Sequence, residues 1–361
     1  MALPCRRDAN VRASRLTAID LFSGCGGLTT GLKNAGFAVL GAVDNDDLSV
    51  EAYRANHPEV RVWRRNIKQL SAAYIRRKLR LRPGQLHLLA GCPPCQAFST
   101  LRTLNGGIVV RNKDKELLFQ FLRFVKALRP KSIMVENVPG LAGDKRIVRF
   151  CAQLARLGYA SEYRVLDAAQ YGVPQRRRRM ILLASRTKVI RFARMKRFRL
   201  TVRHAISGLP NPGSSGDSVH DLPENRSDQT KERIEQTPLD GGSRSSWPNK
   251  LRLSCHSECN GFKDVYGRMS WNDVAPTITT GCFNPSKGRF LHPQQNRTIT
   301  MREAALLQGF PQFYKFPRTA GKCAIAKMIG NALPPPFIEA HANSIRRALN
   351  TSSADRVGRH F

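Results

Sequence analysis

The chain has 361 residues, of which 41% are hydrophobic, and its 60 Lys+Arg against 26 Asp+Glu give a net charge of +34. This size allows two domains, or one large and one small, around a sizeable core. The positive charge favours a polyanionic partner, and no apolar run of about 18 residues is present to span a bilayer, so nucleic acid is favoured over a membrane. The first residues lack the apolar centre of a signal peptide, and the nine cysteines lack paired spacing. We therefore expect free thiols and a cytoplasmic, nucleoid-associated protein.

The N-terminal part predicts a strand, a glycine-rich turn and a helix, which together form a cradle for a nucleoside cofactor. Residues 1–15 are basic and polar, and we expect them to be disordered. The apolar residues 16–22 predict the strand, the glycines that follow predict the turn, and residues 28–35 predict the helix. The dinucleotide-binding pattern would require glycine where Thr29 stands, which disfavours a nicotinamide oxidoreductase.

A second strand is predicted over residues 38–43 and ends at Asp44. A carboxylate at this place commonly accepts hydrogen bonds from ribose hydroxyls, although Asp44 can equally cap a helix over residues 47–56. A third short strand and turn are predicted over residues 63–70, and an arginine-rich surface helix over residues 72–81.

The sequence LLAGCPPCQAFS, residues 88–99, presents a cysteine at the end of a buried strand. The run before Gly91 predicts the strand, and Pro93 and Pro94 stiffen the approach to Cys95. Open α/β sheets bind ligands at this edge. Because Cys92 and Cys95 form a C-x-x-C pair, redox chemistry or zinc binding remains open, although no second cysteine pair stands at zinc-site spacing.

The residues after Cys95 predict further parts of a site. Residues 96–115 are polar and basic and are interpreted as a mobile lid that meets an anion. A helix over residues 116–128 and a strand over residues 132–135 lead to Glu136, at the same sheet edge as Cys95. Helix 147–157 and two antiparallel strands, 163–166 and 180–184, follow. The arginines before the last strand alternate, so Arg177 and Arg179 are expected to share one face.

The C-terminal part is loop-rich from residue 200 to about 295, with few long elements. Thr300 and Glu303 have the spacing of a capping box, which predicts a helix that ends at Gly309. Helices are also predicted over residues 324–329 and 337–349, followed by a flexible tail over residues 350–361.

The segments DLFSGCGGLTTGL, GCPPCQAFS, ENVPGL, QYGVPQRRRR, RTITMREAALLQGFP and IGNALPPP, in this order, resemble the DNA (cytosine-5) methyltransferase family over nearly the whole chain. The resemblance implies an α/β fold: a Rossmann-like methyltransferase sheet that uses S-adenosyl-L-methionine, with helices on both faces, and a smaller target recognition domain. It implies a catalytic and cofactor-binding domain over residues 16–199, target recognition over 200–310, and a segment over 311–349 that returns to the catalytic domain.

The resemblance also assigns roles to the matching positions. Cys95 is expected to be the nucleophile, Glu136 to contact cytosine N3, Arg177 to contact O2, and Arg179 to organise the site. The residues expected to bind S-adenosyl-L-methionine are Phe22, Ser23, Gly24, Gly26, Gly27, Asp44, Asn45, Asn66, Ile67, Pro94, Asn331 and Ala332. The residues expected to contact DNA are Gln96, Ser99, Arg102, Gln175, Thr279 and Thr280. No metal is expected.

One position departs from the family pattern, because the family usually has aspartate where this chain has Asn66. The amide oxygen can still accept a hydrogen bond from the adenine amino group, but without a charge. We expect double-stranded DNA as the partner of a monomer, with a cognate restriction endonuclease as a second partner to be tested. An RNA cytosine-5 methyltransferase and a catalytically silent DNA-binding protein are the alternatives.

Overall fold

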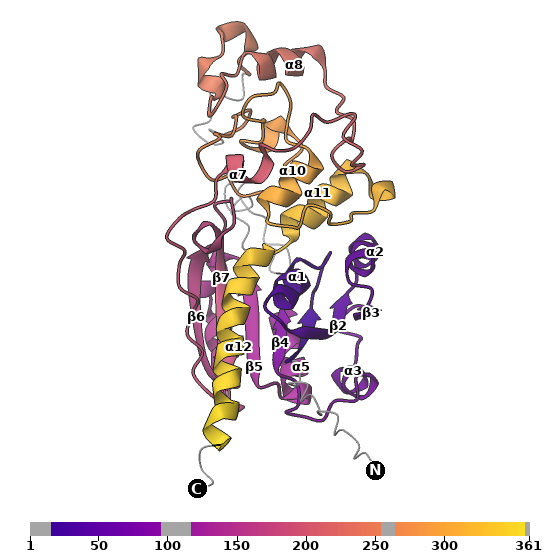
Figure 1. Cartoon of the computed structure of the whole chain (residues 1–361), viewed down its shortest axis with the longest axis vertical. Coiled ribbons are helices and arrows are strands. Elements are labelled where there is room, and N and C mark those ends of the chain that lie inside the picture. Colours follow the sequence, from indigo (N-terminus) through magenta and orange to yellow (C-terminus); the bar gives the residue numbers. More distant parts are fainter. Residues whose placement is uncertain (1–15, 95–116, 254–263, 358–361) are drawn as a thin grey trace, which may run out of the picture.

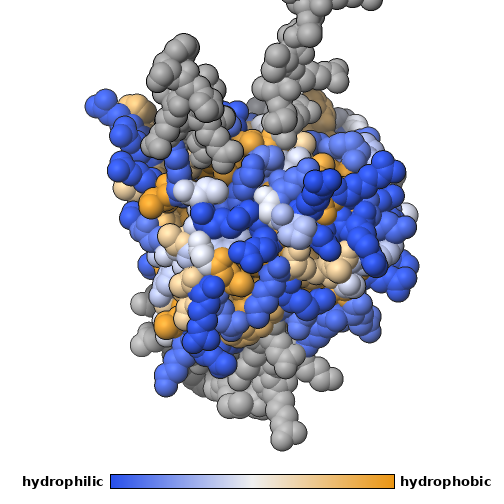
Figure 2. Space-filling model, turned by 90° about the horizontal axis from the view of Figure 1, so that it is seen from below, coloured by the Kyte–Doolittle hydropathy of each residue, from blue (hydrophilic) through white to orange (hydrophobic). Residues whose placement is uncertain are grey.

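A computed structural model of the chain describes residues 16–94, 117–253 and 264–357. It has two lobes (Figure 1). The lower lobe holds a β-sheet, the upper lobe holds short helices and loops, and helix α12 returns along the sheet. The surface seen from below, at the foot of the sheet, is mostly hydrophilic with apolar side chains between (Figure 2).

The sheet has seven strands in the order β3-β2-β1-β4-β5-β7-β6. All neighbours are parallel except β5–β7 and β6–β7, which are antiparallel. This architecture confirms the expected fold class. The strands are β1 (Thr17–Leu21), β2 (Ala38–Asp44), β3 (Arg61–Arg64), β4 (Leu88–Gly91), β5 (Ser132–Asn137), β6 (Ala160–Asp167) and β7 (Arg178–Ser185).

Helices cover both faces of the sheet, because its central strands are apolar on both sides. In β4, Leu88 and Ala90 pack into the core that includes α12, whereas Leu89 packs into the core on the opposite face. The helices of this lobe are α1 (Gly27–Asn34), α2 (Asp47–Asn56), α3 (Ala72–Lys78), α5 (Leu117–Leu128), α6 (Lys145–Arg156) and α12 (Pro335–Val357), with short η3 (Pro139–Gly143) and η4 (Ala168–Tyr171).

Helix α12 differs from its prediction. We expected it to end at residue 349, before a flexible tail over residues 350–361, but it continues to Val357. The apolar pattern ends earlier than the helix, because a helix that has formed can extend by one backbone hydrogen bond for each added residue.

The upper lobe has no named strand among its described residues, and an apolar core and polar contacts hold it together. Its elements are α7 (Val202–Ile206), α8 (Asp228–Glu235), α10 (Met301–Leu307), α11 (Gly321–Asn331), η5 (Arg244–Ser246), η6 (Asn249–Leu251), η7 (Pro285–Lys287) and η8 (Arg318–Ala320). Residues of α7, α10 and α11 share one core. After α11 the chain returns to the sheet as α12.

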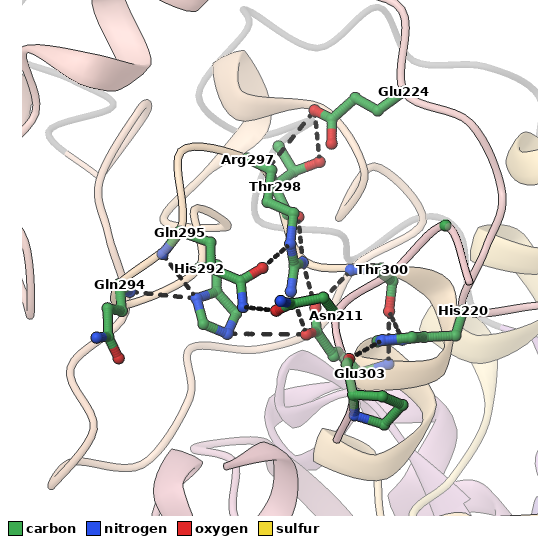
Figure 3. Close-up of polar contacts among 12 residues, drawn as sticks. Asn211, His220, Glu224, His292, Gln294, Gln295, Arg297, Thr298, Thr300 and Glu303 are labelled. Carbon is green, nitrogen blue, oxygen red and sulfur yellow. Dashed lines mark hydrogen bonds and ion pairs between the residues drawn. The ribbon is translucent and has the colours of Figure 1, made fainter. Parts of the chain in front are cut away.

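A buried polar network surrounds the start of α10 (Figure 3). Glu303 accepts hydrogen bonds from both terminal nitrogens of Arg297, at 2.7 and 2.6 Å, and from the backbone N–H of Thr300 at 2.7 Å. The Thr300 hydroxyl accepts a hydrogen bond from the Glu303 N–H, which confirms the capping box. His220 Nδ1 lies 2.8 Å from that hydroxyl. Charged and polar side chains thus fix loops that no sheet supports.

Candidate active site

The carboxyl ends of the parallel strands and the end of α11 enclose a cavity of about 840 Å³. Three expected catalytic residues and most of the expected cofactor residues line it together. They are Phe22, Ser23, Gly24, Gly27, Asp44, Asn45, Asn66, Ile67, Pro94, Glu136, Arg177, Arg179, Asn331 and Ala332. Segments from both lobes therefore meet at one site.

Asp44 organises one end of the cavity. Its carboxylate accepts hydrogen bonds from the backbone N–H groups of Gly24 at 2.8 Å and Asp46 at 2.9 Å. Asp46, not Asp44, caps α2 by accepting from the Ser49 N–H at 2.9 Å, which rejects the capping alternative for Asp44. Burial raises the pKa of Asp44 above its ordinary value.

The turn after β1 bends the backbone around the cavity. Phe22 and Gly24 both have positive φ, 62° and 52°. Ser23 lines the cavity, and its hydroxyl is buried without a hydrogen-bond partner in the described structure. An orphaned hydroxyl beside a carboxylate fits a ligand that carries polar groups, as an amino-acid-bearing nucleoside does.

Two expected cofactor residues have other contacts. Gly26 does not line the cavity: a Cβ there would lie 2.7 Å from His57 Nε2 and from the Tyr314 hydroxyl, so this glycine permits close packing behind the turn. Asn66 lines the cavity, but its side-chain oxygen already accepts from the Lys68 N–H at 3.0 Å.

Glu136 and Arg179 form an ion pair at the other end of the cavity, with Oε1 and Nε 3.0 Å apart. Glu136 stands near the end of β5, and Arg179 near the start of β7, which pairs with β5. Two mostly buried side chains of opposite charge therefore hold each other in place beside the cavity.

Backbone carbonyl groups hold the Arg177 guanidinium. Its terminal nitrogens donate to the carbonyl oxygens of Ile278 at 3.0 Å, Gly330 at 2.8 Å and Ala332 at 3.1 Å. Its Nε is buried without a partner in the described structure. Burial, with the nearby charge of Arg179, lowers the pKa of Arg177 well below its ordinary value. Arg177 and Arg179 both line the cavity, as their alternation predicts.

The proline segment before Cys95 is attached to β5. The Asn137 side chain donates to the Pro93 carbonyl at 2.8 Å, so two of the sequence motifs are in direct contact. Cys92 lines the cavity, and burial, followed by the charge of Glu136, raises the pKa of its thiol well above the ordinary value. Cys95, Gln96, Ser99 and Arg102 lie outside the described residues. The described part of the chain contains no cluster of three His, Cys, Asp or Glu residues that could hold a metal.

The model of the family "C-5 cytosine-specific DNA methylase" matches residues 16–347. The chain belongs to this family. The methylase is 38% identical over 349 residues to the Type II methylase M.HgiDII of Herpetosiphon aurantiacus, covering 92% of this chain and 95% of that protein. It is 33% identical to the Type II methyltransferase M1.BsuMI of Bacillus subtilis, over 91% and 80% of the two chains.

A solved structure shows the same fold. It is described as a DNA modification methyltransferase encoded within a prophage of E. coli, and it aligns with 93% of the methylase and 99% of its own chain at a TM-score of 0.71 and 23% identity. No helix in the described part of the methylase is long and apolar enough to cross a membrane.

Gln175 was expected to contact DNA, but in this structure its side chain bonds inside the protein, so a contact with DNA stays a prediction. Its side chain is fully buried, donates to the Leu307 carbonyl at 3.2 Å and to Gln308 Oε1 at 2.5 Å, and accepts from the Ile278 N–H at 2.9 Å. These bonds to Leu307, Gln308 and Ile278 join the segment before β7 to the upper lobe.

Thr279 and Thr280 lie at the edge of the site, where their backbone packs against Gly330. A Cβ at Gly330 would lie 2.4 Å from the Thr279 carbonyl carbon. The Thr280 side chain is exposed, and its contact with DNA stays a prediction.

Gln308 was not among the expected site residues, although it lies within the motif RTITMREAALLQGFP. Gln308 is fully buried and donates to the Ala332 carbonyl oxygen at 2.5 Å. A polar residue in an otherwise apolar helix end was the available signal, because such a residue must find buried partners.

Proposed function

We propose that the methylase transfers a methyl group from S-adenosyl-L-methionine to C5 of cytosine within a specific sequence of double-stranded DNA. The observation that carries this proposal is the single cavity with two chemically different ends. Asp44 and Ser23 line it beside β2 and β1, and Glu136, Arg177 and Arg179 line it beside β5 and β7, with β4 between these two pairs of strands. A donor and a base can therefore meet in one enclosed space.

The polar end suits the cofactor. Asp44 would accept from the ribose hydroxyls, the turn at Ser23 and Gly24 would receive the amino-acid part, and Asn66 would contact the adenine through its side-chain amide. When bound, S-adenosyl-L-methionine supplies an electrophilic methyl group. Asn331 and Ala332 line the same cavity and would hold its reactive side near the base.

The cysteine supplies the activation that cytosine lacks. We propose that the Cys95 thiolate adds to C6, so that a C–S bond forms and the electron pair of the C5–C6 bond becomes available at C5. C5 then takes the methyl group. A base then removes the C5 proton, the electron pair of the C5–H bond re-forms the C5–C6 double bond, and the C–S bond breaks to regenerate the thiolate. Cysteine suits this role because its thiolate is a strong nucleophile.

Glu136 and Arg177 would stabilise the charge that develops on the ring. Arg177 Nε is an unused donor, and we assign it to cytosine O2. Glu136 would share a proton with N3. The ion pair with Arg179 would hold the Glu136 carboxyl group in place for this contact.

A stacked base cannot enter the cavity, so the target cytosine must flip out of the duplex at a cost of a few kcal/mol. The net charge of +34 supports the phosphate contacts that offset this cost. We propose residues 200–310 as the part that reads the sequence. We propose that the methylase acts in a bacterial cytoplasm, either within a restriction–modification system or as an orphan enzyme.

The test is methylation-aware sequencing of DNA from cells that express the methylase or its Cys95→Ser variant. We expect C5 methylation at one recurring sequence with the wild type and none with the variant. A duplex that carries 5-fluorocytosine in that sequence should then trap a covalent adduct at Cys95. Methyl transfer to tRNA alone, or no adduct in the presence of cofactor, contradicts the proposal.

A further inference from the structure

The methylase has a long acid-free part that contributes little to the cavity. Between Asp167 and Asp217 the chain contains no aspartate or glutamate. Arg177 and Arg179 are used at the cavity, but most of the other positive charges of this part follow β7. They include Arg191, Arg194, Lys196, Arg197 and Arg199, within the sequence RFARMKRFR. We call residues 191–199 the basic segment.

The first third of the basic segment is anchored to the lower lobe. Phe192 and Ala193 pack against the core that contains α12, and the Ala193 N–H donates to His341 Nδ1 at 3.4 Å. The guanidinium of Arg164 lies over the Phe192 ring at 4.9 Å. The backbone is therefore held in place rather than free to fold against another part of the protein.

From Arg194 to Arg199 every side chain is exposed. The apolar ones are included, because Met195 is 62% exposed and Phe198 is 78% exposed. No ion pair in the described part of the chain includes a basic side chain of this segment. Like charges held this close repel one another. The folded protein thus keeps an unneutralised positive surface beside exposed apolar groups.

The basic segment lies at the junction of the two lobes. The Lys196 N–H donates to the Gln170 carbonyl at 2.8 Å, and the Lys196 side chain passes over Gly172. The chain then enters the upper lobe, where the Val202 N–H donates to the Asp273 carbonyl at 2.9 Å. In Figure 1 this connection runs beside β6, at the level where the lobes meet. A duplex placed between the lobes would extend past this level.

We propose that the basic segment binds the phosphate backbone of duplex DNA that flanks the target cytosine. The inference rests on the proposed function for the identity of the polyanion. Guanidinium and ammonium groups would contact successive phosphates, and the carbon surfaces of Met195 and Phe198 would pack against the sugars between them. Such contacts position the protein on the duplex and read no sequence.

The test uses two variants that each remove three positive charges. The segment variant is Arg194→Gln/Arg197→Gln/Arg199→Gln. The control variant is Arg77→Gln/Arg80→Gln/Arg82→Gln, whose exposed side chains lie in and after α3, across the sheet from β6. Binding to a 30-base-pair duplex of mixed sequence is measured at several salt concentrations. The slope of log K against log[salt] reports how many phosphates the protein neutralises.

We expect the segment variant to reduce this slope by about 2–3 and the control to leave it unchanged. Equal slopes for wild type and segment variant, or an equal reduction in the control, overturn the proposal. Vesicles of phosphatidylserine provide a second polyanion. A loss of binding to vesicles as large as the loss on DNA indicates general attraction to anions and also overturns it.

Methyl incorporation into plasmid DNA separates this inference from the proposed function. No residue of the basic segment lines the cavity, so at saturating DNA the segment variant should keep the wild-type rate. If the wild type itself transfers no methyl group to DNA, the proposed function fails, and the slope comparison still decides whether the segment binds phosphates.

Discussion

Gln308 and Arg177 donate hydrogen bonds to the same backbone oxygen, the carbonyl oxygen of Ala332, at 2.5 and 3.1 Å. Gln308 in turn accepts from Gln175, which accepts from the Ile278 N–H, and the Ile278 carbonyl accepts from Arg177. These five residues form a closed ring of buried hydrogen bonds that joins the two lobes at the cavity.

This ring predicts that Gln308 positions Arg177. The change Gln308→Met keeps the volume but removes one hydrogen bond each from Gln175 and from the Ala332 carbonyl, at a cost of about 1 kcal/mol per bond, while Gln175 keeps its bonds to Leu307 and Ile278. Because the Ala332 carbonyl that accepts from Arg177 is then held less firmly, we expect kcat for methyl transfer to fall at least about tenfold, which corresponds to about 1.4 kcal/mol. Single-turnover rates under saturating DNA and cofactor measure this effect. An unchanged kcat with a lowered melting temperature would limit Gln308 to a structural role.

The ion pair between Glu136 and Arg179 predicts a graded response to substitution. Arg179→Gln removes the charge, whereas Arg179→Lys keeps the charge but loses the guanidinium that also donates to the Arg178 carbonyl at 2.7 Å. We expect kcat to fall about 100-fold or more for glutamine and less for lysine. Cofactor affinity, measured by calorimetry, should change little in either variant. A loss of kcat that is equal in both variants would contradict a role for the charge itself.

Asp44 and Asp46 provide a matched pair for cofactor binding. Asp44→Ala removes a carboxylate that lines the cavity, and we expect the Kd for S-adenosylhomocysteine to rise about tenfold or more, since hydrogen bonds to a charged group are worth about 1.5–3 kcal/mol. Asp46→Ala removes the cap of α2, which costs about 1 kcal/mol of stability. Asp46 also lines the cavity, but its carboxylate is occupied by the Ser49 N–H and by Lys327, so calorimetry should show an affinity close to that of the wild type for the Asp46 variant. If both variants lose affinity equally, Asp44 has no specific role.

Burial predicts that the methylase loses stability in weak acid. It lowers the pKa of His57, His292 and His341 to about 4 in the folded state, against about 6.5 when unfolded. Between pH 6.5 and 4 the unfolded chain takes up protons that the folded protein does not, so each histidine reduces stability as pH falls. Asp20, whose pKa burial raises to about 8, acts in the opposite direction. Asp44, whose pKa burial also raises, acts in the same direction as Asp20, and the three histidines outweigh these two carboxyl groups.

His341 offers the simplest test of this pH dependence. It lies among the rings of Tyr171, Phe192 and Phe337, so His341→Phe suits its surroundings. Urea unfolding from pH 7.5 to 5 should show a pH slope smaller by about 1.4 kcal/mol per unit below pH 6.5 in this variant. A slope equal to that of the wild type would show that His341 does not contribute.

The sequence predicted the sheet and the residues at its carboxyl edge because strand ends can be located from apolar runs. Asp44, Glu136 and Pro94 lie there as expected. It could not predict which way Gln175 points, since a polar side chain among arginines has no periodic partner to fix its face. Gly26 was expected at the cofactor, but it does not line the cavity. A glycine pattern shows that the backbone turns, but not which side of the turn faces the ligand.

The upper lobe was the least predictable part. Its contacts, such as the ion pair of Arg297 with Glu303, join residues through hydrogen bonds rather than through a repeating apolar pattern. The capping box was found because its spacing is local. By contrast, His220 bonds Thr300 and Ile278 bonds Gln175, and the residues of each pair are distant in sequence and meet only in the folded chain.

Arg177 takes one of its three carbonyl partners, Ile278, from the segment proposed to recognise DNA. Exchange of residues 200–310 with those of a relative would therefore also replace the Ile278 carbonyl, which helps to hold Arg177, the residue that we propose contacts the cytosine. A chimera that binds its new sequence yet places this carbonyl differently would occupy DNA without methylating it. Specificity in this enzyme is thus transferable only together with the backbone around Ile278.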